Sequence, residues 1–293
     1  MKKTGSRKMN RREALGWMGA LALSARMNGA AAAEATAEKP KIAMQLYTLR
    51  EPAKKDLAGT LKKVREMGWE YVQWSGMPSL PAEQIRAALD EAGLEAISCH
   101  CGVEAFEKAF EKEVAFWKTV GVTYAGPGGM MGDCRDSLDA WIRGAKRLDA
   151  VGAKMREHGL RLIYHNHAGE FEKFEGDDRT KEAILADETS PENLLLELDL
   201  AWVYVGGVDP AESIRQFSGR VDHVHAKDVF VTKGKKKRHL FTPLGRGELD
   251  WDEIFKAGRQ AGIKWYTYEQ DSGVGDPFEY SAESYEFLRK KLG

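Results

Sequence analysis

The strongest constraint on this chain is a repeated alternation of short apolar runs with longer helical patterns, which continues from residue 41 to the end. In the longer segments apolar residues recur three and four positions apart, as in 56–67, and a glycine such as Gly68, Gly93 or Gly121 often ends the pattern. The eight short runs predict strands at 42–46, 71–74, 95–98, 123–125, 161–164, 194–198, 221–224 and 265–268. Eight strand–helix units in roughly 250 residues predict a single α/β domain folded as a closed (β/α)8 barrel.

An open, doubly wound sheet is the main alternative to the barrel. A dinucleotide-binding sheet of that kind needs a glycine-rich loop after its first strand. Residues 45–50, where the first predicted strand ends, contain no glycine. The 41–293 segment also contains no internal linker, so we expect one domain, and three cysteines are too few for a disulfide framework.

The first 33 residues predict an export signal rather than part of the domain. A basic stretch at 2–12 precedes a short apolar stretch at 15–25 and the small residues Ala30 to Ala33, which is the layout of a secretory signal peptide. The pair Arg11-Arg12 resembles the twin-arginine export signal. We therefore expect a signal peptide at 1–33, a linker at 34–40 and the barrel at 41–293.

This layout has consequences for the location of the mature protein. The apolar stretch is too short to span a bilayer, so we expect no stable membrane insertion after signal cleavage. The protein is then periplasmic or otherwise exported, with the export machinery as a transient partner. The alternative is an N-terminal amphipathic helix of the domain, which Gly16 and Gly19 would weaken.

The charge is divided unevenly along the chain. Residues 1–33 hold seven Lys and Arg and one acidic residue, which leaves 37 basic and 44 acidic residues in the rest. Binding to nucleic acid without sequence preference requires cations that neutralise phosphates. The acidic body therefore excludes nucleic acid as an expected partner.

Polar side chains gather where the later strands of the predicted barrel end, which is where barrel enzymes build their active sites. Residues two apart on a strand share a face, so His165 and His167 point the same way, as do His223, His225 and Lys227. The carboxylates of Asp199 and Glu269 lie at the ends of two further strands and can converge with these imidazoles on the barrel axis. Mixed imidazole and carboxylate ligands suit Mn²⁺, Zn²⁺, Fe²⁺, Co²⁺ or Mg²⁺.

Several motifs in this region carry a family resemblance. They are His165-Asn-His167 with Glu170-Phe171, Leu198-Asp199-x-x-Trp202, His225-x-Lys227-Asp228, Gly245-x-Gly247 and Glu269 on a late strand. In this order, and across about residues 41–290, they resemble the xylose isomerase-like TIM-barrel superfamily. The branch with the greatest resemblance is the one called sugar phosphate isomerases/epimerases.

This resemblance implies one divalent metal ion held by four side chains. Asp199, His225 and Glu269 match three of the family's ligand positions. Many members have Glu at the fourth position, where this chain has His165, so His165 ligates the metal, binds substrate, or leaves ligation to Glu170. Imidazole ligands favour Mn²⁺ or Zn²⁺, with Mg²⁺, Co²⁺ and Fe²⁺ also compatible.

The resemblance also implies a metal-dependent sugar isomerase or epimerase that removes a proton next to a carbonyl group and forms an enediolate. The expected base is His167 or Glu170, and Glu269 serves as ligand and as a second candidate base. Lys227 is expected to polarise an oxygen atom or to bind an anionic group. The expected substrate contacts are Gln45, His100, Trp202 and Lys227.

Two alternative functions fit the same residues. A metal-dependent lyase or dehydratase acting on a keto-sugar or keto-glycoside would use the same enediolate but lose a β-substituent. A catalytically inactive, exported barrel would bind sugar without changing it. In each case the expected partner is a small carbohydrate, and the sequence predicts no oligomeric state.

Overall fold

The computed structural model describes residues 39–232, 238–273 and 275–293. The signal peptide expected at 1–33 and most of the linker lie outside the described residues. Residues Pro40–Gly293 form one compact unit. Within the described residues, no helix combines the length and the apolar character that a membrane crossing requires.

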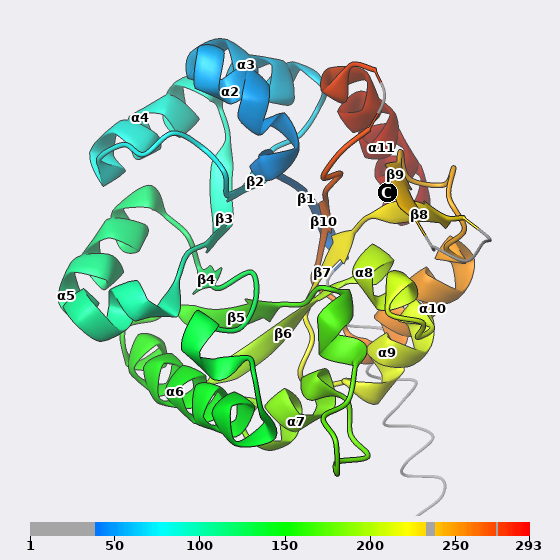
Figure 1. The fold of residues 1–293 in the computed structure, drawn as a ribbon. Coiled ribbons are helices and arrows are strands. Elements are labelled where there is room, and N and C mark those ends of the chain that lie inside the picture. The colour runs from blue at the N-terminus through cyan, green and yellow to red at the C-terminus, as the bar shows by residue number, and fades with distance from the viewer. Residues whose placement is uncertain (1–38, 233–237, 274) are drawn as a thin grey trace, which may run out of the picture. The chain divides into compact units, whose positions relative to one another are not determined.

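Eight parallel strands close into a barrel, which confirms the predicted fold class (Figure 1). Neighbours in the barrel follow the order of the sequence, and β10 pairs with β1 to close it. The barrel strands are β1 (Lys41–Gln45), β2 (Tyr71–Trp74), β3 (Glu95–His100), β4 (Tyr124–Gly126), β5 (Arg161–His165), β6 (Leu194–Asp199), β7 (His223–Ala226) and β10 (Trp265–Tyr268).

Helices cover the outside of the barrel, as Figure 1 shows. They are α2 (Arg50–Lys55), α3 (Leu57–Glu66), α4 (Ala82–Ala92), α5 (Val103–Val120), α6 (Leu138–Glu157), α7 (Lys181–Asp187), α8 (Leu200–Val205), α9 (Pro210–Gln216), α10 (Trp251–Ala261) and α11 (Pro277–Leu292). Short 3-10 turns occur at η1 (Leu46–Leu49), η2 (Gly132–Cys134) and η3 (Ala168–Phe171). Side-chain caps fix several helix starts, for example Ser137 at α6 and Asp209 at α9.

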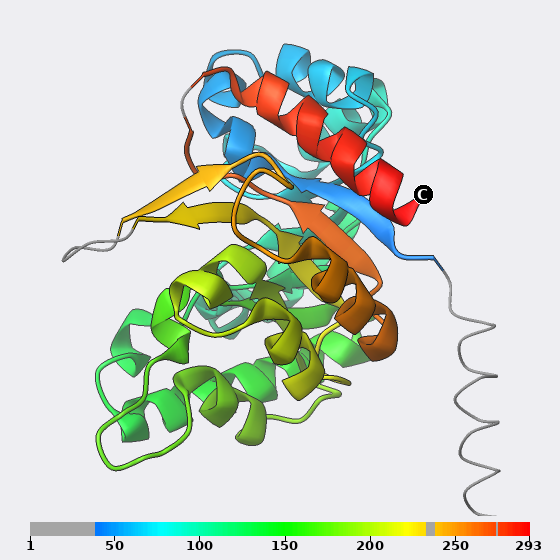
Figure 2. The same cartoon turned by 90° about the vertical axis from the view of Figure 1, so that its right-hand side faces the viewer.

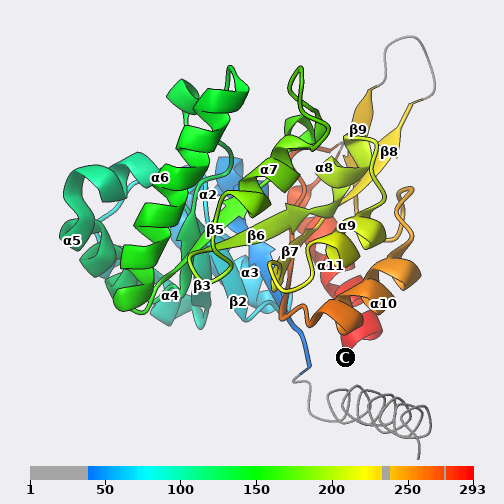
Figure 3. The same cartoon turned by 90° about the horizontal axis from the view of Figure 1, so that it is seen from below.

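A β-hairpin that the sequence pattern did not reveal lies between β7 and α10. Strands β8 (Asp228–Val231) and β9 (His239–Thr242) pair antiparallel, with Val229 opposite Phe241. Figures 2 and 3 show this hairpin extending away from the barrel, beside α8. The pattern does not separate this hairpin from β7, because β8 begins only two residues after β7 ends.

The interior of the barrel is divided into an apolar and a polar part. Tyr124, Ile163 and Leu195 form a small buried cluster with Trp265 against it, separate from the main core between the sheet and the helices. These residues lie toward the amino ends of their strands, whereas the buried polar residues His165, Glu197 and Thr267 lie farther along β5, β6 and β10. The apolar cluster therefore fills one end of the barrel, and the buried polar groups collect toward the carboxyl ends.

Candidate metal centre

Four buried side chains from four strands meet at the carboxyl end of the barrel. His165, Asp199, His225 and Glu269 each offer one ligand atom, and these atoms all lie within 4.8 Å of one another. His165 and Asp199 end β5 and β6, His225 lies in β7, and Glu269 follows β10 directly. The parallel register places Asp199 opposite His225, so barrel closure brings together residues up to about a hundred positions apart.

Specific atoms of this cluster face one another. His225 Nδ1 lies 2.9 Å from Glu269 Oε2 and 3.9 Å from Asp199 Oδ2. His165 Nε2 lies 3.9 Å from the same Asp199 oxygen. Two imidazole nitrogens and two carboxylate oxygens thus surround one small volume.

The charges of the cluster are strongly coupled. Burial opposes a charged imidazole, but the carboxylates of Glu197 and Glu269 outweigh it and raise the pKa of His225 to about 10. Burial and the neighbouring His225 hold the pKa of His165 well below its usual range, so His165 keeps a free lone pair. Burial would raise the pKa of Glu269, yet Lys227 and His225 hold it well below its ordinary value.

The donor set fits a divalent cation. Asp199, Glu197 and Glu269 are buried acids, and Lys227 is the one buried lysine that faces them among the described residues. Asp199 Oδ2 accepts no well-directed hydrogen bond from a described residue, although Lys227 Nζ lies 2.7 Å away. Two imidazoles and two carboxylates form a ligand set that Mn²⁺ and Zn²⁺ bind readily.

Lys227 is buried directly beside these carboxylates. Its Nζ contacts Asp199 Oδ2 at 2.7 Å, Glu269 Oε2 at 2.8 Å and Asp271 Oδ1 at 3.0 Å. These three acids raise the pKa of Lys227 against the effect of burial, so its ammonium group stays charged. Burial and the neighbouring Glu269 raise the pKa of Asp271 to about 6.

A second donor cluster lies beside the first and shares two residues with it. His100, His165, Glu197 and His225 also offer ligand atoms within 4.8 Å of one another. His100 Nε2 lies 2.6 Å from Glu197 Oε2, and His225 Nε2 lies 3.3 Å from it. Glu197 is not among the site residues predicted from the sequence. The signal was present, because Glu197 lies two residues before Asp199 and therefore on the same strand face.

The residues expected to contact substrate fall into two groups. Gln45 is fully buried and hydrogen-bonds Gln73, and His100 contacts Glu197. Trp202 forms the second group: it is half-buried, and its ring centroid lies 5.3 Å from that of His167.

The β8–β9 hairpin adds two aromatic side chains beside Trp202. The ring centroids of His239 and Phe241 lie 4.8 Å and 5.1 Å from that of Trp202. Lys227 Nζ lies 5.1 Å from the centroid of Phe241. We call His167, Trp202, His239 and Phe241 the aromatic wall. The sequence predicts no role for His239 or Phe241, because its pattern does not reveal the hairpin that places them here.

Glu170 does not join either cluster. Its Oε1 accepts a hydrogen bond from the Tyr164 hydroxyl at 2.9 Å, and its Oε2 accepts one from the His167 backbone N–H at 2.9 Å. The second of these contacts is part of the capping box of the η3 turn. Of the two candidates for the fourth ligand position, His165 is the one that the fold brings to Asp199 and His225.

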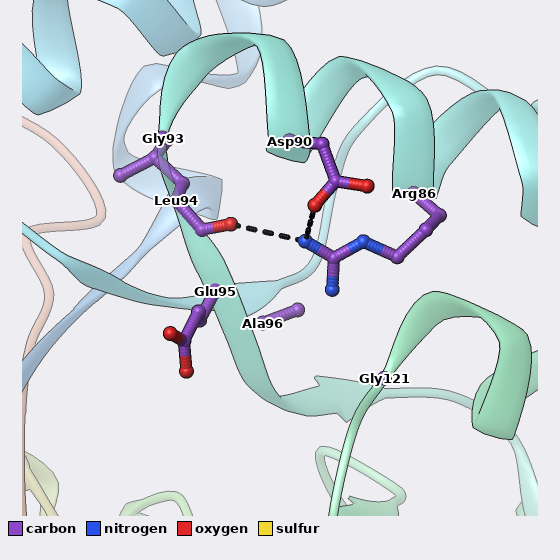
Figure 4. A pocket seen from close by; sticks show the side chains of 7 residues that line it. All are labelled: Arg86, Asp90, Gly93, Leu94, Glu95, Ala96 and Gly121. Carbon is purple, nitrogen blue, oxygen red and sulfur yellow. Dashed lines mark hydrogen bonds and ion pairs between the residues drawn. The ribbon is translucent and has the colours of Figure 1, made fainter.

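A separate cavity of about 430 Å³ lies away from these groups, at the amino end of β3 (Figure 4). Arg86, Asp90 and Glu95 are the charged residues that line it. The guanidinium group of Arg86 donates to Asp90 and to the carbonyl oxygens of Val120 and Leu94. Because the protein's own acceptors already engage this group, we assign no ligand site there.

Comparison with known proteins relates the chain to enzymes and to solved barrels. Inosose dehydratase from Geobacillus thermodenitrificans is 30% identical over 174 residues, which cover 54% of this chain and 56% of that protein. The chain thus matches about half the length of such curated relatives. A solved sugar phosphate isomerase/epimerase from Parabacteroides distasonis has a TM-score of 0.72 at 21% identity, covering 86% of this chain and 98% of that one.

A xylose isomerase-like barrel protein from Mycobacterium smegmatis, solved in complex with magnesium, has a TM-score of 0.64 at 16% identity, covering 88% of this chain and 97% of that one. At these identities the likeness to solved structures is one of fold. The sequence model of the family described as "Xylose isomerase-like TIM barrel" matches residues 61–291, well over half of the chain. The chain therefore belongs to the xylose isomerase-like TIM barrel family.

Proposed function

We propose that the protein is a divalent-metal-dependent enzyme that removes the proton next to the carbonyl group of a polyhydroxy ketone and returns it, as a sugar isomerase or epimerase. The observation that carries this proposal is the convergence of His165, Asp199, His225 and Glu269 within 4.8 Å of one another. The carboxylates of Asp199 and Glu269 are costly to bury without cations beside them, and a divalent ion would supply that charge.

His165, Asp199, His225 and Glu269 would hold the metal ion, with Mn²⁺ or Zn²⁺ favoured. A bound ion of this kind supplies Lewis acidity, which polarises a substrate carbonyl and acidifies the neighbouring C–H bond. Among the protein's own groups, Glu269 is the first candidate to accept that proton, because Lys227 and His225 hold its carboxylate ionised. His167 is a second candidate base, because burial lowers its pKa and leaves the imidazole neutral.

Lys227 has the chemistry to stabilise charge on the substrate. Its ammonium group already contacts Asp199 and Glu269, so an oxygen atom of a substrate bound near Glu269 would lie within its reach. A charge-assisted hydrogen bond from Lys227 would stabilise the negative charge that develops on that oxygen as the proton leaves.

The aromatic wall supports a carbohydrate as the substrate. Sugar rings present apolar C–H faces between polar hydroxyl groups, and they stack on aromatic side chains while their hydroxyls form hydrogen bonds. Trp202 is half-buried and supplies such a surface, the buried Phe241 packs behind it, and His167 and His239 supply polar edges next to them. The wall lies on the side of the site where Lys227 approaches the Trp202 and Phe241 rings.

Dehydration of a keto-sugar or keto-cyclitol is the second candidate function. It is favoured by the curated relatives named inosose dehydratase. The first step would be the same proton removal, but a β-hydroxyl group would then leave instead of the proton returning. The proton taken up by Glu269 could pass to that hydroxyl group, which would leave as water, while Lys227 beside Glu269 stabilises the negatively charged oxygen.

Proton NMR in D₂O tests the proposal and separates the two reactions. The protein is loaded with Mn²⁺ or Zn²⁺, freed of excess metal, and incubated with a panel of keto-sugars and inososes. An isomerase or epimerase gives a product with solvent deuterium at the altered carbon, whereas a dehydratase gives a new alkene or dicarbonyl. EDTA-treated protein and the Glu269→Gln variant serve as controls and should lose activity. Sugar binding without any deuterium exchange would contradict catalysis and favour the inactive sugar-binding barrel.

We also propose that the protein is exported. The basic stretch, the Arg11-Arg12 pair and the short apolar run that follows support this proposal. The test is to express the full chain with a C-terminal tag and to compare it with a variant carrying Arg11→Lys and Arg12→Lys. Export through the twin-arginine route predicts that the wild type leaves the cytoplasm and that the double variant stays there. Equal distribution of the two proteins would contradict it.

A further inference from the structure

Two donor clusters compete for the same pair of imidazoles. His225 turns Nδ1 toward Glu269 and Asp199, and Nε2 toward Glu197. His165 likewise turns Nε2 toward Asp199 and Nδ1 toward Glu197. Only a ring nitrogen without a hydrogen atom can bind a metal ion, so the position of the His225 hydrogen decides which cluster can hold one.

A chain of buried hydrogen bonds reaches His225 from the opposite side of the barrel. The Tyr47 backbone N–H donates to Gln45 Oε1 at 3.4 Å, and Gln45 Nε2 donates to Gln73 Oε1 at 2.6 Å. Gln73 Nε2 then donates to Glu197 Oε1 at 2.7 Å. Gln45, Gln73 and Glu197 are all fully buried. We call these three residues the relay.

The direction of the hydrogen bonds along the relay is fixed at both of its ends. A backbone N–H can only donate, and an ionised carboxylate can only accept. Reversing the Gln73 amide would bring its oxygen to the Glu197 carboxylate, and reversing the Gln45 amide would bring its NH₂ group to the Tyr47 N–H. Because water cannot compensate for such mismatches at fully buried groups, the two amides have one orientation.

This orientation determines the hydrogen on His225. Gln73 Oε1, an acceptor, lies 2.7 Å from His225 Nε2, and Glu197 Oε2, also an acceptor, lies 3.3 Å from it. His225 Nε2 must therefore carry a hydrogen atom. The hydrogen that the ring gives up when it binds a metal ion is then the one on Nδ1, which faces Glu269 and Asp199.

We infer that the relay of Gln45, Gln73 and Glu197 holds His225 in the Nε2–H form, so that the metal centre is the cluster with Asp199 and Glu269 and not the cluster with His100. This inference rests on the proposed function. Gln73 and Glu197 are positioning residues, because they act on the metal only through the orientation and the tautomer of His225. Glu197 and His100, which contact each other, then hold neighbouring side chains in place without binding the metal ion themselves.

Two variants test the relay. Glu197→Gln replaces the obligatory acceptor with a group that can also donate, which allows the Gln73 amide to reverse and present its NH₂ group to His225. Gln73→Met removes the acceptor while keeping the length of the side chain. We expect each variant to bind Zn²⁺ about 10- to 100-fold more weakly than the wild type, the range typical of groups that orient metal-bound histidines. Isothermal titration calorimetry measures these affinities.

Gln270→Met is the matched control. Gln270 is a buried glutamine beside Glu269, but it hydrogen-bonds the Ser272 carbonyl oxygen and not the relay. Its variant should bind Zn²⁺ within about twofold of the wild type. Thermal unfolding of all variants shows whether a weaker affinity reflects loss of the fold.

Nitrogen-15 NMR of histidine-labelled protein gives the readout that a merely structural role would not change. In the Zn²⁺-loaded wild type we expect coordination through His225 Nδ1 and a hydrogen on Nε2. Coordination through His225 Nε2, or unchanged Zn²⁺ affinity in both relay variants, would overturn the role of the relay. Neither result would contradict metal binding by the protein.

The metal-free protein separates failure of the relay from failure of the proposed function. The relay predicts a His225 Nε2–H resonance that is protected from exchange with solvent, and its protection should fall in Gln73→Met. A wild type that binds no metal but shows this change would contradict the proposed function while upholding the relay. An Nε2–H that exchanges freely in the wild type would overturn the relay directly.

Discussion

At the scale of single residues, Asp199 performs two tasks with its two oxygens. Its Oδ1 accepts the Trp202 backbone N–H at 2.9 Å and caps α8, while Oδ2 faces His165 and His225. Asn can keep the cap because its side-chain oxygen also accepts. The Asp199→Asn variant should therefore fold but lose a charged ligand.

We expect Asp199→Asn to weaken Mn²⁺ or Zn²⁺ binding by more than about 100-fold, beyond the loss typical of outer-shell changes. Isothermal titration calorimetry measures the affinity, and the helical circular dichroism signal reports the fold. Asp209→Asn is the matched control, because Asp209 caps α9 and takes no part in the cluster. Equal affinity in Asp199→Asn and the wild type would show that Asp199 is not a ligand.

Glu182 in α7 provides a pH-dependent prediction away from the metal centre. It is fully buried, and neither of its carboxylate oxygens has a hydrogen-bond partner among the described residues. Burial, with Glu170 nearby, raises the pKa of Glu182 well above 4.5. The folded protein thus binds this proton more tightly than the unfolded chain does. The wild type therefore loses stability as pH rises above about 4.5, by up to about 1.4 kcal/mol per pH unit.

Glu182→Gln removes this titration, so the variant should gain stability relative to the wild type as pH rises from 5 to 7. Urea unfolding of both proteins at several pH values measures the difference. Glu192→Gln, at an exposed position just before β6, is the control and should follow the wild type. A stability difference that stays constant over this range would contradict a raised pKa for Glu182.

At the scale of elements, Asp228 organises the segment between β8 and α10. This fully buried carboxylate accepts hydrogen bonds from the backbone N–H groups of Gly245 and Gly247 and from Trp251 Nε1. A Cβ atom at Gly247 would lie 2.1 Å from Asp228 Oδ1, so only glycine allows this approach. Contact with Asp228 thus explains Gly247 of the Gly245-x-Gly247 motif, and the positive φ of 80° explains Gly245.

Asp228→Ala should destabilise the protein by about 3 kcal/mol or more, because it leaves several buried donors without an acceptor. Urea unfolding measures the change. Asp209→Ala, which removes a helix cap at an exposed position, should cost only about 1 kcal/mol. A similar loss in both variants would show that Asp228 acts as no more than an ordinary cap.

At the scale of the whole molecule, closure of the barrel joins β5, β6, β7 and β10 around one group of charges. A metal ion that binds only the folded state stabilises it by mass action, by about 2.7 kcal/mol at a concentration 100 times the dissociation constant. For a chain of this size we expect Mn²⁺ or Zn²⁺ to raise the melting temperature by about 5–10 °C.

Differential scanning fluorimetry with EDTA-treated protein measures this shift. Asp199→Asn should show little or no shift under the same conditions, which separates binding at the cluster from nonspecific effects of metal. Mg²⁺ should stabilise less than Mn²⁺, because two of the four donors are imidazoles. A shift of equal size in Asp199→Asn would place the binding elsewhere.

The sequence by itself determined the fold and the strand ends that carry the candidate metal centre. Alternation of apolar runs and helical patterns requires a sheet covered by helices, and eight such units fit a closed barrel. The two-residue period of a strand also placed His165, His225 and Asp199 on inward faces, because side-chain direction in a strand depends only on local backbone geometry.

Only the tertiary structure decided which of these inward residues meet. Glu170 lies five residues after His165, yet it caps a turn while His165 reaches Asp199. The contacts of Gln73 with Glu197 and His225 join residues 124 and 152 positions apart. Such contacts depend on barrel closure and on the register between strands. These are properties of the folded chain as a whole, and no local pattern of residues encodes them.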